Sequence, residues 1–193
     1  MRGPITVHEY MSLCINHPEL GYYHQNNEKI GQEGDFITSP EISQIFGEML
    51  AIWCISMWEK MGCPPKINLI EMGPGHATLM KDLLRTFKKF PKFKESVQVN
   101  MIELSEDMKK VQQIALIGQV VPSSSSADSN RTPSFATSVD GVKIAWYRLL
   151  REVPQGDPIL FLGQEILDTF PVHQFQYTGM LLLSLLSLRF HKL

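Results

Sequence analysis

Apolar residues recur every three or four positions in several stretches of the chain, as they do along one face of an amphipathic helix. The first stretch follows a capping box at residues 6–9, which predicts a helix to about Asn16. The second follows Ser39 and Pro40, the expected N-cap and first helical residue. The residues of this second helix that we expect to face the core are Ile42, Ile45, Phe46, Met49, Ile52 and Trp53.

Two further helices are expected later in the chain. One runs from Leu79 to Phe90, directly after a glycine turn, and has an apolar residue at nearly every helical repeat. The other begins after Ser105, whose hydroxyl can act as the N-cap. The apolar face predicted for this last helix consists of Met108, Val111 and Ile114.

Short apolar runs between these helices predict strands. The runs are Leu69 to Met72, Val97 to Ile102 and Ile159 to Leu162, and the last is suited to burial on both faces. Ile144 to Tyr147 is expected to form a short strand with its own local core. Because strands alternate with helices, the pattern predicts an α/β protein with a parallel, doubly wound sheet.

The glycine turn at residues 73–75 (GPG) joins the first of these strands to a helix, so a ligand could approach bare backbone and helix amides there. Glu71 stands two residues before the turn, and Ala77 stands two residues after its second glycine. A dinucleotide fingerprint places that small residue one position later, which disfavours a dinucleotide oxidoreductase. Glu103 ends the next strand, where a carboxylate can accept hydrogen bonds from both hydroxyls of a ribose.

Composition narrows the class of protein. The 193 residues suggest one domain, with or without a small appendage, and 44% hydrophobic residues can build a sizeable core. A net charge of −2 gives no electrostatic case for binding nucleic acid. The three cysteines lack a Cys-x-x-Cys spacing, which fits a reducing compartment and argues against a zinc site or disulfide framework. No transit peptide is visible, and residues 181–188 are too few to span a bilayer.

Polar residues gather before the second helix and after the last apolar strand. The candidates for a ligand-facing role before the helix are Asp35, Thr38, Ser39 and Gln44, which are more polar groups than one cap requires. Glu165 and Asp168 follow the strand at the end where open α/β sheets bind their ligands. The structural alternative is that Glu165 is solvated and that Asp168 caps a turn before Pro171.

Several motifs occur together and in a fixed order. They are residues 3–7 (GPITV), 21–23 (GYY), 34–48 (GDFITSPEISQIFGE), 71–75 (EMGPG), Glu165 with Asp168, and 171–173 (PVH). This set closely resembles the MidA-like protein arginine methyltransferases, which are mitochondrial factors needed for assembly of respiratory complex I. The resemblance covers roughly residues 3–176 and is most specific through 34–48.

The resemblance implies a Rossmann-like class I methyltransferase in the mitochondrial matrix, which uses S-adenosyl-L-methionine to methylate an arginine of a complex I subunit. No metal and no stable membrane insertion are expected. The residues expected to bind the cofactor are Glu71, Gly73, Gly75, Ala77 and Glu103. Glu165, with Asp168 beside it, is the expected catalytic carboxylate, because a carboxylate can accept two parallel N–H bonds from a guanidinium.

The chain departs from the family pattern at several positions. The family usually has Arg, Gly, and Asn or His where this chain has His76, Ala77 and Gln164. After Tyr177 the pattern stops, which indicates a truncated or alternatively spliced form whose sheet is incomplete in its C-terminal half. The strand Ile159 to Leu162 would then lie at a sheet edge, and residues 180–188 are expected to form a short helix or an irregular tail.

The expected organisation has three parts. Residues 1–63 form a helical segment that packs on the core, residues 64–177 form a cofactor-binding half-domain with a serine-rich surface loop at 122–138, and residues 178–193 form a divergent tail. Two other functions stay open. A methyltransferase for small molecules would need no paired carboxylates, and a non-catalytic assembly module would retain only part of the cofactor fold.

Overall fold

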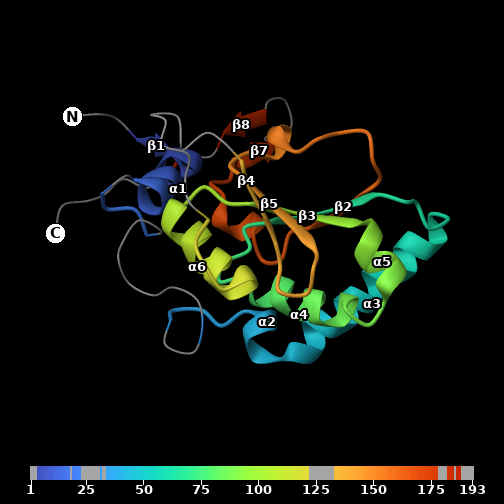
Figure 1. Ribbon diagram of the computed structural model, residues 1–193. Helices are drawn as coiled ribbons and strands as arrows, with labels where there is room; N and C mark the ends of the chain where they lie inside the picture. Colours follow the sequence, from blue (N-terminus) through green and yellow to red (C-terminus); the bar gives the residue numbers. More distant parts are fainter. Residues whose placement is uncertain are drawn as a thin grey trace. The chain divides into compact units, whose positions relative to one another are not determined.

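The computed structural model describes residues 4–17, 19–22, 31, 34–121, 133–177, 182–184 and 186–187. They belong to two compact units (Figure 1). The sheet unit is Ile30–Gln164, and the terminal unit combines Met1–Lys29 with Glu165–Leu193. This division differs from the expected boundaries after residues 63 and 177, which stay a prediction.

In the part of the sheet unit that the structure describes, five strands lie in the order β4-β5-β3-β2-β6. They are β2 (Ile67–Met72), β3 (Val97–Ile102), β4 (Ser134–Thr137), β5 (Lys143–Tyr147) and β6 (Ile159–Leu162). All neighbours are parallel except β4, which runs antiparallel to β5. Met72 lies opposite Ile102 and Ile102 opposite Tyr147, so the carboxyl ends of the three middle strands are level. The predicted α/β class with a mostly parallel sheet is confirmed.

The helices of this unit are α2 (Ser39–Ile42), α3 (Gln44–Lys60), α4 (Thr78–Phe87), α5 (Pro91–Ser96) and α6 (Glu106–Ile117). Helices α3 to α6 lie on one face of the sheet (Figure 1). Their side chains form one large core with the inward residues of the sheet. The other face carries a smaller cluster around Ile70, Ala145 and Val153. Within the sheet unit the described helices therefore cover a single face, unlike those of a doubly wound sheet.

The second predicted helix is two helices, because the backbone of Ser43 is extended (φ −153°, ψ 125°). Thr38, not Ser39, occupies the N-cap position of α2. The hydroxyl of Ser43 caps α3 by accepting a hydrogen bond from the backbone N–H of Ile45 at 3.3 Å. The predicted N-cap at Ser39 was therefore wrong. Ser39 is the first residue of α2, and Ser43, four residues later, is the N-cap of α3.

The buried face of α3 has small residues in its first part and Ile55 and Trp58 in its last part, and the predicted core face was wrong except at Phe46. Gly47, Ala51 and Cys54 are buried, and a Cβ on Gly47 would lie 2.5 Å from Cβ of Asp82 on α4. Close approach of two helices selects small side chains, which leaves the large ones outside. The large residues that are exposed are Ile42 (67%), Ile45, Met49 (62%), Ile52 and Trp53, whereas Phe46 packs on the core.

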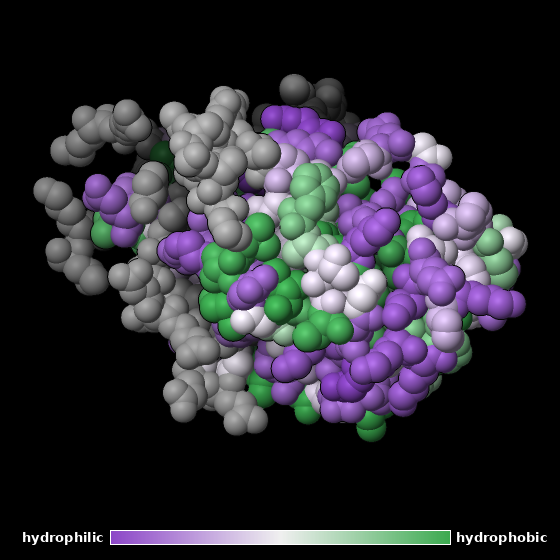
Figure 2. All heavy atoms as spheres, viewed as in Figure 1, coloured by the Kyte–Doolittle hydropathy of each residue, from purple (hydrophilic) through white to green (hydrophobic). Residues whose placement is uncertain are grey.

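Helix α6 shows the same reversal. Gln112, Gln113 and Leu116 are buried, while Val111 and Ile114 of the predicted apolar face are exposed. Figure 2 shows hydrophobic side chains at the surface where α6 lies. The predicted N-cap is correct, because the hydroxyl of Ser105 accepts a hydrogen bond from the backbone N–H of Met108.

The edges of the sheet contain one confirmed prediction and three corrections. Among the described strands β6 pairs only with β2, so it lies at an edge as predicted, but Ile159 (45% exposed) and Phe161 (47%) show that one of its faces is open. Strand β5 pairs with β3 in the main sheet rather than forming a local core. Of the expected serine-rich loop, residues 122–132 lie outside the described residues, and Ser134–Thr137 form β4 because they pair with β5.

The terminal unit contains the predicted first helix, α1 (Val7–Asn16). Its capping box is complete, since the hydroxyl of Thr6 accepts from the N–H of Glu9 at 3.1 Å and the Glu9 carboxylate accepts from the N–H of Thr6 at 2.9 Å. Strand β1 (Ile5–Thr6) pairs with β9 (Leu186–Ser187), and β7 (Phe175–Tyr177) pairs with β8 (Leu182–Ser184), both antiparallel. The tail therefore contains short strands, which corrects the expected helix or irregular segment. No helix in the described residues is long and apolar enough to cross a membrane.

Candidate functional site

The carboxyl end of β2 leads into a turn with three left-handed residues. Gly73, Gly75 and Ala77 have φ values of 65°, 53° and 63°. The N–H of Gly73 donates to the carbonyl of Ile102 at 3.1 Å, and the N–H of Ala77 donates to the carbonyl of Pro74 at 2.8 Å. The first bond ties the turn to the end of β3, and the second closes the turn just before α4 begins. The turn therefore stands at the level strand ends, with the N-terminus of α4 directly behind it.

Ala77 occupies the N-cap position of α4 and is fully buried. A side chain that carries a Cβ is disfavoured in the left-handed region by roughly 1 kcal/mol, whereas glycine adopts it freely. The conformation of Ala77 is therefore one that glycine would fit better, which agrees with the glycine usual at this position in the family that the sequence resembles.

We expect Ala77→Gly to raise the free energy of unfolding by about 1 kcal/mol, because it removes that strain. Chemical denaturation of the purified chain measures the change. The matched control is Ala115→Gly inside α6, where the same substitution should cost about 1 kcal/mol of helix stability. Equal losses in the two variants would contradict the prediction.

Glu71 lies near the end of β2 on the side of the main core, beneath the glycine turn. Its side chain is 3% exposed, and this burial raises the pKa of the carboxyl from 4.5 to about 8. Its Oε2 atom has no hydrogen-bond partner among the described residues. A buried carboxyl with an unused oxygen is costly unless a ligand or water completes its hydrogen bonds.

Glu103 follows β3 directly, and its backbone N–H donates to the carbonyl of Tyr147 at 2.9 Å. Its carboxylate accepts hydrogen bonds from the backbone N–H of Ser105 at 2.8 Å and from Nε2 of Gln112 at 2.9 Å. Burial raises the pKa of Glu103, and these hydrogen bonds oppose that shift. A carboxylate has about four lone-pair positions, so both oxygens keep capacity for a ligand.

Gln112 is a site residue that the sequence analysis missed. It is fully buried on α6, and its amide group contacts both the glycine turn and Glu103. Two consecutive glutamines in a helix predict a solvent-facing position, because hydrophobic periodicity assigns polar residues to the outer face. The sequence contains no local signal that would have found it.

Helix α2 is attached to the first turn of α4, because Oγ1 of Thr78 donates a hydrogen bond to the carboxylate of Glu41. This contact joins residues 37 positions apart, so no local pattern in the sequence indicates it. Gln44 is engaged within α3, where its Nε2 donates to Oε1 of Glu48 at 2.8 Å. Ligand-facing roles for Asp35, Thr38, Ser39 and Gln44 stay predictions.

Glu165 and Asp168 belong to the terminal unit, and both are exposed. Asp168 lies in a short 3₁₀ helix, η3 (Leu167–Thr169), and Glu165 follows the end of β6 by three residues. Glu165 has a φ of 49°, a left-handed conformation that costs a non-glycine residue energy and that clusters at functional sites. The catalytic roles expected for Glu165 and Asp168 stay predictions.

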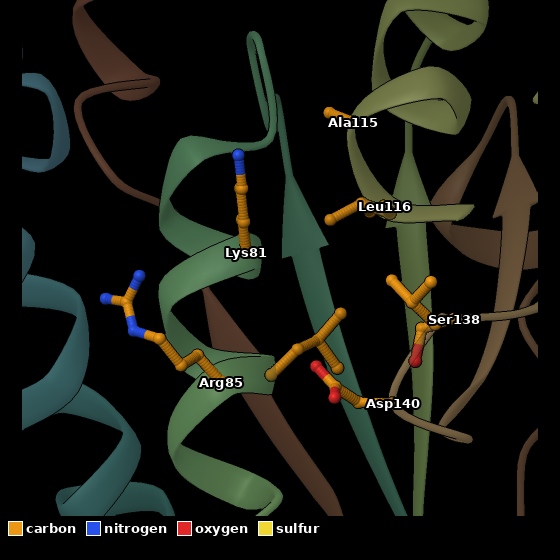
Figure 3. Close-up of a pocket in the computed structure, with 8 residues that line it drawn as sticks. Lys81, Arg85, Ala115, Leu116, Ser138 and Asp140 are labelled. Carbon is orange, nitrogen blue, oxygen red and sulfur yellow. The ribbon is translucent and has the colours of Figure 1, made fainter. Parts of the chain in front are cut away.

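A pocket of about 190 Å³ lies between α4, α6 and the turn from β4 to β5 (Figure 3). It is lined by Lys81, Leu84, Arg85, Ala115, Leu116, Ser138, Val139 and Asp140. It is smaller than the roughly 300 Å³ at which small-molecule sites begin. It also contains none of the predicted site residues, so it is not the crevice at the strand ends. The described residues contain no cluster of His, Cys, Asp and Glu that could hold a metal ion.

Comparison with known proteins points to one family. The family described as "putative S-adenosyl-L-methionine-dependent methyltransferase" matches residues 49–187. The mitochondrial protein arginine methyltransferase NDUFAF7 of Mus musculus is 41% identical over 179 residues, which are 91% of this chain and 40% of that protein. The Homo sapiens protein of the same name is 42% identical over 180 residues, again 91% and 40% of the two chains. The chain thus spans about two-fifths of the length of these relatives.

Solved structures show the same fold. A Burkholderia thailandensis protein crystallised with S-adenosyl-homocysteine superposes with a TM-score of 0.64 at 22% identity, over 94% of this chain and 42% of that one. A second protein from the same bacterium superposes with a TM-score of 0.56 at 24% identity, over 88% and 36% of the two chains. At these identities the likeness concerns the fold.

Proposed function

The chain belongs to this family of S-adenosyl-L-methionine-dependent methyltransferases, and we propose that its sheet unit binds the cofactor at the carboxyl ends of β2 and β3. The observation that carries the proposal is the convergence of Glu71, the left-handed turn at residues 73–77 and Glu103 at level strand ends. Open α/β sheets bind their ligands at this edge.

The residues present fit the cofactor. The unpaired Oε2 of Glu71 is an acceptor suited to a cationic group, and the free lone pairs of Glu103 suit a pair of ribose hydroxyls. The left-handed turn at residues 73–77 lets the backbone approach the methionyl part closely. When bound, the cofactor supplies an activated methyl group.

We propose that the methyl acceptor is an arginine of a protein, since relatives at about 41% identity are named protein arginine methyltransferases. Glu165, with Asp168 beside it, would hold the guanidinium through two parallel hydrogen bonds and orient one nitrogen lone pair. The carboxylates would also favour departure of the proton after transfer, and most of the rate gain would come from positioning. The strained backbone of Glu165 supports a functional role.

The names of the relatives support a proposal for the compartment, and the family resemblance supports one for the partner. Because they are named mitochondrial, we propose that this chain acts in the mitochondrial matrix. By its resemblance to the MidA-like family, we propose a subunit of respiratory complex I as the protein substrate.

We also propose that this chain alone has impaired activity. It spans about two-fifths of the length of its relatives, and among the described strands β6 lies at a sheet edge with Ile159 and Phe161 exposed. An apolar strand at a sheet edge is prone to association. Weak cofactor binding and no methylation are therefore expected from this chain alone.

Calorimetric titration of the chain with S-adenosyl-L-methionine, followed by an assay of methyl transfer to complex I subunits with labelled cofactor, tests these proposals. Binding without turnover is the expected result. Absence of binding by a folded chain would contradict the cofactor site. Clear turnover by a monodisperse preparation would contradict the impairment and support the catalytic role.

A non-catalytic assembly module is the second candidate, and the exposed apolar residues of α2 and α3 favour it. Ile42, Ile45 and Met49 are each more than 60% exposed, and such patches often mark protein interfaces. This candidate predicts a stable complex with a partner protein that forms without the cofactor and persists in a Glu103→Ala variant.

A further inference from the structure

We propose that Gln112 is a positioning residue that holds the Glu103 carboxylate and the glycine turn in the arrangement that the cofactor's ribose requires. The inference rests on the proposed cofactor site and adds a residue on α6 that lies outside the sequence motif. It is carried by the three hydrogen bonds of one buried amide group.

The Gln112 side chain uses its donors and its acceptor on three different segments. Its Nε2 donates to Oε2 of Glu103 and to the carbonyl of Gly75, both at 2.9 Å. Its Oε1 accepts a hydrogen bond from Nε1 of Trp146 at 3.1 Å. The amide thereby joins the turn after β2, the residue after β3 and an inward side chain of β5. These are the three neighbouring strands whose carboxyl ends are level.

The orientation of this amide follows from the chemistry of its partners. The Trp146 indole can only donate, whereas the Gly75 carbonyl and the Glu103 carboxylate can only accept. The amide oxygen must therefore face Trp146, and the amide nitrogen must face the crevice. A flipped amide would set donor against donor and acceptor against acceptor. Trp146 is 1% exposed, so water is not available to relieve such a mismatch.

The consequence for Glu103 is a fixed carboxylate plane. Both carboxylate oxygens are held, Oε1 by the N–H of Ser105 and Oε2 by Gln112, and the backbone of Leu104 also donates to the carboxylate. The remaining lone pairs are then directed before the ligand arrives. A carboxylate that is already oriented loses less conformational entropy when the ligand binds than one that the ligand must order. Gln112 also keeps the carbonyl of Gly75 at a set separation from Glu103.

The competing explanation is that Gln112 only satisfies a buried core position. The neighbouring residue provides a matched control for that explanation. Gln113 is also buried, and its Oε1 accepts from the N–H of Val121 at 3.0 Å, away from the glycine turn and Glu103. If burial alone mattered, substitutions at the two glutamines would affect cofactor affinity alike.

The test is calorimetric titration of the full chain with S-adenosyl-L-methionine. Methionine has nearly the volume of glutamine, so Gln112→Met removes the three hydrogen bonds and leaves little cavity. We expect it to weaken cofactor affinity about tenfold or more, by analogy with other supporting-shell substitutions. Gln113→Met should change affinity by less than about twofold. Denaturant unfolding of each variant separates lost affinity from lost stability.

A double-mutant cycle supplies the readout that a merely structural role would not move. If Gln112 acts through Glu103, then Gln112→Met should cost little further affinity in a Glu103→Ala chain. An undiminished loss in that background would overturn the proposal, as would equal losses for the two glutamine variants. If Gln112→Met does not fold, Trp146→Phe removes the donor that orients the amide, together with part of the buried ring, and the same loss of affinity is expected from it. A folded wild-type chain that does not bind the cofactor would instead refute the proposed function.

Discussion

Replacing Glu103 by alanine is expected to weaken S-adenosyl-L-methionine binding by roughly a hundredfold. In the proposed cofactor site the change would remove two charge-assisted hydrogen bonds to ribose hydroxyls, which together would contribute about 3 kcal/mol. Ser105 and Gln112 fix the position of the Glu103 carboxylate by donating hydrogen bonds to it. We therefore expect that no neighbouring residue takes the place of this carboxylate in the variant. Calorimetric titration measures the dissociation constant, and denaturant unfolding verifies that the variant remains folded.

The matched control is Glu106→Ala in the first turn of α6. Like Glu103, Glu106 is a glutamate that follows β3 closely in the sequence. It forms only long ion pairs, with Lys109 at 3.8 Å and with Arg148 at 3.9 Å. Its loss should leave cofactor affinity within about twofold, since surface ion pairs of this kind contribute 0–1 kcal/mol. Unchanged affinity in a folded Glu103→Ala chain would remove Glu103 from the cofactor site.

The stability of the chain is expected to fall as the pH rises from about 4.5 to about 8, and Glu71 is the main cause. Its pKa is raised by burial from 4.5 to about 8, so in this window the folded chain holds a proton that the unfolded chain has released. Stability falls with pH wherever the unfolded state binds fewer protons. Below pH 4.5 the contribution of Glu71 to the free energy of unfolding is fully present. Its loss as the pH rises lowers that free energy by a few kcal/mol at most.

Glu71→Gln isolates this effect, because an amide does not ionise. The variant should lose most of the pH dependence between 4.5 and 8 and should be more stable than the wild type at pH 8. Burial also raises the pKa values of Asp82 and Glu103, which act in the same direction, so the difference between the two stability curves is the quantity to measure. Glu95→Gln, at an exposed position, is the control. Parallel curves for wild type and Glu71→Gln would show that Glu71 does not carry the dependence.

The features that the sequence predicted correctly depend on short-range patterns. The capping box of Thr6 and Glu9 forms as expected because its partners are three residues apart. The strand, glycine turn and helix around residues 67–87 follow from apolar runs and from residues that permit left-handed backbone. The place of Glu103 at a strand end is set by the same pattern. Local chemistry determines these elements almost without help from the rest of the fold.

The features that the sequence did not reveal depend on which surfaces meet. Large apolar residues of α3 face outward because Gly47 and Ala51 allow α4 to approach closely. Gln112 faces inward because Glu103, Gly75 and Trp146 together satisfy its amide. Neither preference is visible in periodicity, which records hydrophobicity and not the identity of the contact partner. The catalytic roles of Glu165 and Asp168 stay predictions for a similar reason, since residue spacing does not determine how they meet a substrate.

The pairing of β1 with β9 sets an order for folding during synthesis. Ile5 is synthesised long before its partner Ser187. The whole of the sheet unit is synthesised between them, so its contacts can begin to form while β1 has no strand to pair with. Closing so long a loop costs little more entropy than closing a loop half its length, so the pairing is late rather than weak. A ribosome stalled before residue 186 would carry a nascent chain with its N-terminal strand unpaired and open to chaperones.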